Sequence, residues 1–66
     1  MLAIAYHNLG VEEDFCKHYE AAIESYTKAL NLIEEHGGPQ DPLYAKFKEA
    51  VDEATEVQYF VSNLNH

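Results

Sequence analysis

The sequence predicts an all-α fold in which two helices form a hairpin and a longer third helix follows, and three observations support it. Apolar residues recur at steps of three and four along most of the 66 residues, which places them on one side of an α-helix. This spacing is interrupted at two short segments, residues 16–18 and 36–41, and the second contains two glycines and a proline. Hydrophobic residues make up 47% of the chain and charged residues 24%, as in proteins that fold around a core. We therefore expect one helical domain over residues 1–66.

The first helix is predicted over residues 2–15. Its apolar residues follow a helical period without an internal proline: Leu2, Ala5, Tyr6, Leu9 and Phe15. Gly10 costs this helix ~1 kcal/mol relative to alanine, which indicates that a neighbour packs too closely for a side chain. A short turn at residues 16–18 leads into the next helix.

The second helix is predicted over residues 19–35, and the others are expected to pack around it. Ala22 and Ala29 are seven residues apart and flank Tyr26 on one face, so a neighbouring backbone can approach closely there. An apolar stripe accompanies them: Tyr19, Ile23, Tyr26, Leu30 and Ile33. Two antiparallel helices joined by so short a turn form an αα-hairpin. Residues 36–39, His-Gly-Gly-Pro, end the second helix because glycine allows a left-handed cap and proline cannot continue the helix.

The third helix is predicted over residues 42–63, after a linker at residues 39–41. Asp41 can cap its free N–H groups, and Pro42 suits the first helical position. Its apolar residues step by four and three and form a narrow heptad seam: Leu43, Phe47, Ala50, Ala54, Val57, Val61 and Leu64. Three heptads permit a coiled coil without requiring one. Four polar residues near the C-terminus are expected to fray: Ser62, Asn63, Asn65 and His66. The third helix and this frayed tail together span residues 42–66.

Six residues of the predicted hairpin resemble the signature of the tetratricopeptide repeat: Tyr6, Leu9, Gly10, Ala22, Tyr26 and Ala29. In that family the two helices of a repeat touch through these positions. The segment GGPQDPLYA is similar to the linker of the longer repeats found in kinesin light chains. A 42-residue step lays Ala45 on Ala3, so that the third helix takes the place of the next repeat's first helix. The resemblance implies one repeat, residues 1–38, followed by a capping helix.

Three positions depart from the family pattern. Glu13 stands where an aromatic residue is usual, Lys17 where the turn often has glycine, and Val51-Asp52 where the second copy would have Leu-Gly. We therefore expect an inter-helix turn of a different or tighter shape and a third helix that covers the end of the array. Because about three repeats are needed for stability, either the third helix substitutes for missing repeats or the uncovered face of the first helix meets another chain.

Charge and composition exclude several partners. The net charge of −8, from twelve acidic residues against four lysines, opposes binding to nucleic acid or to an anionic membrane. The single Cys16 excludes an internal disulfide and fits a reducing compartment. No apolar run approaches the ~18 residues that span a bilayer, and the N-terminus lacks the features of a secretion signal. We expect a cytoplasmic protein, with a cytoskeletal association implied only by the family resemblance.

The sequence contains no pattern that is typical of catalysis or of metal binding. Cys16, His18 and His7 lack the spacing of a zinc site, and residues 12–14, Glu-Glu-Asp, lack the glycine and alternating oxygen ligands of a calcium loop. A cysteine nucleophile would need a histidine base in a cleft, for which three helices leave little room. We expect a protein that is not an enzyme and that has no cofactor.

The resemblance implies a protein-interaction or scaffold module at the C-terminal end of a larger repeat array. Carried over by position, the residues that line its peptide-binding groove are His7, Asn8, Val11 and Asp14. Their acidic neighbours favour a basic or neutral peptide.

The alternative is a small structural protein that self-associates as a homo-oligomer. Association would use either the uncovered face of the first helix or the third helix, through Phe47, Val57 and Val61.

Two tyrosines lie off the main stripe and are further candidates for contact with a partner: Tyr44 and Tyr59.

Overall fold

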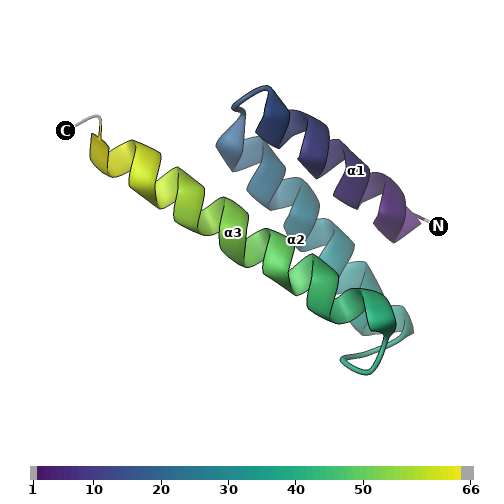
Figure 1. Ribbon diagram of the computed structural model, residues 1–66. Helices are drawn as coiled ribbons and strands as arrows, with labels where there is room; N and C mark the ends of the chain where they lie inside the picture. Colours follow the sequence, from purple (N-terminus) through teal and green to yellow (C-terminus); the bar gives the residue numbers. More distant parts are fainter. Residues whose placement is uncertain (1, 65–66) are drawn as a thin grey trace.

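The computed structural model describes residues 2–64, and it contains three helices and no strand within that range (Figure 1). They are α1 (Leu2–Phe15), α2 (Tyr19–His36) and α3 (Pro42–Leu64). The predicted all-α fold is confirmed, and each observed boundary lies within one residue of its prediction. Residues 62–64, expected to fray in part, belong to α3, while residues 65–66 of the predicted tail lie outside the described residues.

The α1–α2 hairpin and α3 are arranged so that α2 lies against both other helices (Figure 1). Contacts between α1 and α3 are few by comparison. The last turns of α3 extend past the α1–α2 turn, away from the rest of the molecule (Figure 1). The second helix is therefore the central element around which the others pack, as the sequence predicts.

The α1–α2 turn closes through a Schellman motif built on Lys17. The His18 N–H donates to the Glu13 carbonyl at 2.8 Å, and the Lys17 N–H donates to the Asp14 carbonyl at 2.9 Å. Lys17 has a φ of 65°, the left-handed conformation that normally favours glycine. A lysine thus occupies the turn in a glycine-type backbone conformation.

The α2–α3 link follows the stop and start signals in the sequence. The Gly37 and Gly38 N–H groups donate to the Ile33 carbonyl at 2.8 and 2.9 Å, with Gly38 at a φ of 73°. The Asp41 carboxylate accepts a 2.8 Å hydrogen bond from the Leu43 N–H, which is the bond of an N-cap residue. The predicted end of α2 and the predicted cap of α3 are both present.

The core lies along α2 in two clusters. The first joins all three helices and consists of Ala3, Ala29, Ile33 and Phe47. The second joins α2 to α3 and consists of Ala22, Tyr26 and Ala54. Ala22 and Ala29 are both fully buried, so these small residues are where neighbouring helices approach most closely.

The close packing that Gly10 predicts is present at the α1–α2 contact. A Cβ atom on Gly10 would lie 2.6 Å from Cδ1 and Cε1 of Tyr26, closer than Cβ atoms come to other groups. Leu9, predicted to pack inside the hairpin beside it, is instead 44% exposed. The reason is that Ala3 and Gly10 form the side of α1 that meets α2, and Leu9 projects beside that contact.

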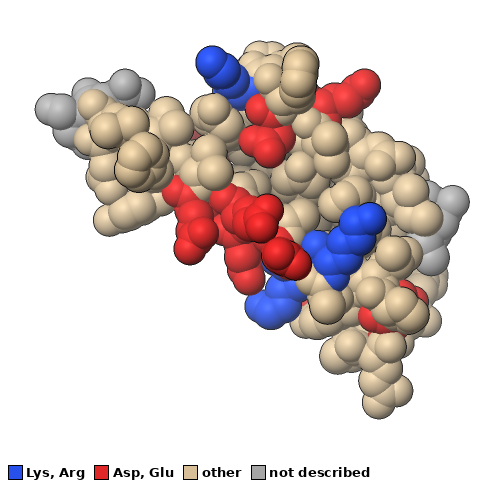
Figure 2. Space-filling view, viewed as in Figure 1, with Lys and Arg blue, Asp and Glu red and all other residues tan. Residues whose placement is uncertain are grey.

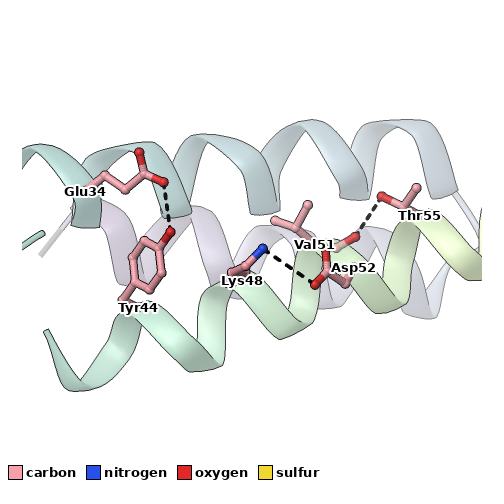
Figure 3. Close-up of polar contacts among 6 residues, drawn as sticks. All are labelled: Glu34, Tyr44, Lys48, Val51, Asp52 and Thr55. Atoms are coloured by element: carbon pink, nitrogen blue, oxygen red, sulfur yellow. Dashed lines mark hydrogen bonds and ion pairs between the residues drawn. The ribbon is translucent and has the colours of Figure 1, made fainter. Parts of the chain in front are cut away.

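Polar contacts at the helix interfaces are few. The Tyr44 hydroxyl donates to Glu34 at 3.3 Å and connects α3 to α2, whereas the Lys48–Asp52 ion pair, at 4.0 Å, lies on the exposed side of α3 (Figure 3). The Thr55 hydroxyl donates to the Val51 carbonyl within the same helix (Figure 3). Between α1 and α2, the buried Ser25 hydroxyl donates to the Glu13 carboxylate. This bond accounts for an acidic residue at the edge of that interface.

Candidate interaction surfaces

Large apolar side chains are exposed on α1 and α3, and we divide them into three named stripes. The outer stripe of α1 comprises Leu2, Ala5 and Leu9; the open stripe of α1 comprises Ile4, Val11 and Phe15; the α3 stripe comprises Val57, Phe60 and Leu64. The members of each stripe recur at steps of three, four or seven, so each runs along one side of its helix. The uncovered apolar surface therefore lies on the two outer helices.

The four residues predicted to line a peptide groove divide into two pairs. Asn8 and Val11 are exposed, whereas His7 and Asp14 are half-buried. The His7 ring stacks on Phe47 with 4.5 Å between ring centroids and 8° between planes. It also lies 5.4 Å from the Tyr26 ring. His7 thus belongs to the contact among the three helices, which corrects its assignment to an open groove.

The surroundings of His7 favour its neutral form. Burial, and next the positive charge of Lys46, hold the pKa of His7 below its ordinary value of 6.5. Its Nδ1 atom is buried and has no hydrogen-bond partner within residues 2–64. A neutral imidazole that stacks on Phe47 and packs at an angle against Tyr26 serves packing at this position.

Burial raises the pKa of the Tyr26 hydroxyl, and the charges of Asp14, Glu53 and Glu13 raise it further. These carboxylates come from both α1 and α3, so acidic side chains surround the junction of the helices. The junction therefore presents negative charge to any partner that approaches it.

The three residues proposed for self-association through the third helix differ in their exposure to solvent. Phe47 is 2% exposed and belongs to the core, so it is not available to a partner. Val61 is half-buried, and only Val57, at 41% exposure, is open. The correction has a simple cause: the first half of the heptad seam packs on α2, and the apolar side chains left over lie on another side of α3.

The contact residues expected from the sequence did not include Phe60, Phe15 or Ile4. In the structure Phe15 is 88% exposed and Phe60 64% exposed. The signal that could have found the α3 stripe is that Phe60 stands three residues after Val57 and four before Leu64, on a line offset from the buried Phe47 and Ala54. Of the two tyrosines proposed for contact, Tyr59 is exposed, while Tyr44 is half-buried and bonded to Glu34.

Two hollows lie at the surface near the α1–α2 turn. One, of about 410 Å³, lies at the end of α1 and is lined by Val11, Glu12, Phe15 and Cys16. The other, of about 450 Å³, lies between the start of α2 and the end of α3 and is lined by residues 17–21 with Gln58, Val61 and Ser62. The second hollow exists because α3 extends past the hairpin (Figure 1).

Within residues 2–64, no three side chains of His, Cys, Asp or Glu are grouped as a metal site. No helix in that range is long and apolar enough to cross a membrane. Comparison with models of protein families, with curated proteins and with solved structures finds no match to this chain. The interaction stripes are accordingly the features from which a function can be argued.

Proposed function

We propose that this protein is a non-enzymatic protein-interaction module of the tetratricopeptide type, which forms the C-terminal end of a larger repeat array in the cytoplasm. The observation that carries the proposal is the contrast between the two ends of the three-helix unit. Leu2 and Leu9, on the outer stripe of α1, are 61% and 44% exposed. Over residues 42–56 of α3, the positions half a turn from the buried Phe47 and Ala54 are small or acidic: Ala45, Glu49, Asp52 and Glu56. Two exposed apolar residues of α3, Phe60 and Leu64, lie beyond this part of the helix, where α3 extends past the hairpin (Figure 1).

The contrast supports an array that extends from α1 and stops at α3. An apolar outer face gains free energy when another helix covers it, whereas a polar outer face suits contact with water. The close approach of Gly10 to Tyr26 is a second supporting observation, since it is the contact expected at the family's Leu-Gly position. In this proposal Asn8 and Val11 contact a basic or neutral peptide, and neither nucleic acid, membrane nor cofactor takes part.

To test this proposal, two consensus tetratricopeptide repeats are fused to the N-terminus of the chain so that the last helix of these repeats contacts the outer stripe of α1, and unfolding of the fusion is measured. If this stripe is an array face, the fusion unfolds in one cooperative transition with a higher midpoint than the chain alone. A matched fusion carrying Leu2→Asp and Leu9→Asp should lose this coupling. Two independent transitions in the unsubstituted fusion, with the midpoint of the chain unchanged, would refute the array proposal.

A homodimer formed through the outer stripe of α1 is the second candidate function, and the exposure of Leu2 and Leu9 favours it equally. Sedimentation over a concentration series separates the two candidates. A dimer that dissociates in the Leu2→Asp variant supports self-association. A chain that remains monomeric at high micromolar concentration rejects it.

A further inference from the structure

The C-terminal half of α3 combines an apolar stripe with an acidic flank on one side of the helix. Glu49 and Glu53 precede Val57, Phe60 and Leu64 at steps of four, four, three and four, so all five follow one line along α3. This line spans 16 residues, and its ends are about 22 Å apart along the helix. Phe60 and Leu64 are 64% and 69% exposed, and neither α1 nor α2 covers them.

The line begins near the junction of α3 with the other two helices. Glu53 is close enough to Tyr26 to raise its pKa, and Lys46, seven residues earlier on the same side, is close enough to His7 to lower its pKa. Beyond the end of α1, the last turns of α3 extend past the hairpin, and Phe60 and Leu64 are exposed there (Figure 1).

Charge indicates what kind of partner fits this surface. Residues 49–64 contain four acidic residues and no lysine or arginine. Lys48 is paired with Asp52, and Lys46 lies three residues before Glu49, at the start of the line and away from the apolar stripe. Figure 2 shows acidic side chains gathered over the middle of α3 and an uncharged surface toward its end. A partner that covers the line must therefore offer apolar side chains at one end and positive charge at the other.

We propose that the α3 stripe and its acidic flank bind a basic amphipathic helix of another protein. Three apolar side chains at helical steps contact the α3 stripe, and lysines or arginines one to two turns away lie beside Glu49 and Glu53. This surface is separate from the outer stripe of α1, and the inference stands whether or not α1 joins a repeat array.

A second copy of the chain fits this surface less well than a basic helix does. Each copy carries a net charge of −8, and its apolar α3 stripe adjoins carboxylates with no lysine among them. Parallel pairing would place Glu49 and Glu53 beside the same residues of the other copy, and like charges oppose such contact. A basic segment removes this repulsion and gains from the opposite charge.

The test measures binding of a labelled 18-residue synthetic helix by fluorescence anisotropy. The helix carries leucines at steps of three and four in one half and four lysines in the other, and it is used in both orders of the two halves. We expect one order to bind, with an affinity that falls as salt is raised from 50 to 300 mM. Replacing both glutamates by lysine (E49K with E53K) should weaken binding roughly tenfold. Phe60→Ala with Leu64→Ala should weaken it by a similar factor.

The matched control changes the same charge on α2, where Glu24 and Glu35 are exposed. The E24K and E35K double variant has the same net charge as the α3 double variant, and we expect it to lose less than about threefold in affinity. Circular dichroism verifies that every variant keeps its helical content.

Four outcomes would overturn the proposal. The first is that neither peptide binds, and the second is that a peptide with glutamates in place of the lysines binds equally well. The third is that the α2 and α3 charge variants lose the same affinity for the peptide. The fourth is that the protein forms a homodimer whose association strengthens with salt and which dissociates when Phe60 is changed. The last would assign the stripe to a second copy.

Discussion

Replacing Lys17 by glycine should stabilise this protein, although the change removes a side chain and adds backbone freedom. Lys17 has a φ of 65° in the α1–α2 turn. For a residue with a Cβ atom this conformation is unfavourable by roughly 1–2 kcal/mol, whereas glycine adopts it freely. Glycine also loses roughly 0.5–1 kcal/mol more backbone entropy on folding. The difference leaves a net gain of about 0.5–1 kcal/mol for Lys17→Gly.

The assay is thermal unfolding followed by circular dichroism. For a domain of this size, 1 kcal/mol corresponds to a shift of about 4–8 °C in Tm, so we expect Lys17→Gly to raise Tm by about 2–8 °C. The control is Lys17→Ala, which removes the same charge but keeps the Cβ atom, and its Tm should change by less than about 2 °C. A glycine variant with an unchanged or lower Tm would show that the left-handed turn carries no strain.

Three further predictions concern the core. Gly10→Ala should destabilise the fold by about 1–2 kcal/mol in chemical denaturation, because overpacking against the buried Tyr26 ring outweighs the helix propensity of alanine; a gain in stability would contradict the close approach. Phe47→Ala should lower the free energy of unfolding by about 3–5 kcal/mol and unfold most of the chain, whereas Phe60→Ala should change it by less than about 0.5 kcal/mol. Equal effects of the two substitutions would contradict the burial of Phe47 and the exposure of Phe60. Because the folded-state pKa of His7 is lowered, its contribution is fully present above pH 6.5 and decreases as the pH falls below that value. The stability loss between pH 7 and 5 should therefore be smaller in His7→Phe, and equal losses would show that His7 does not titrate in this way.

Local signals in the sequence were sufficient for the helices and their ends. The Gly-Gly-Pro segment after His36 ends α2 because its glycines supply the hydrogen bonds and left-handed backbone of a cap. Asp41 and Pro42 begin α3 for reasons that act within three residues. Gly10 predicted a close neighbour because a glycine inside a helix is otherwise unfavourable. These features depend on residues near one another in the chain, so sequence alone determined them.

The interaction surfaces could be predicted only in part. Asn8 and Val11 are exposed, as the family resemblance implies, but the same resemblance assigned His7 to an open groove. The heptad pattern assigned Phe47 to a self-association surface. The rings of these two residues instead stack on one another where the helices meet. The family assignment and the array it implies stay predictions. A helical period shows that residues share a side of a helix, and it does not show which neighbour covers that side.

The sequence by itself determined three helices, their boundaries and the small residues through which α2 is approached. The tertiary structure decided which apolar residues α2 covers and which remain open. Each helix carries more apolar positions than one contact can bury, so the relative placement of the helices selects among them. That selection buries Phe47, leaves Leu9 uncovered on α1, and leaves Phe60 uncovered where α3 extends past the hairpin.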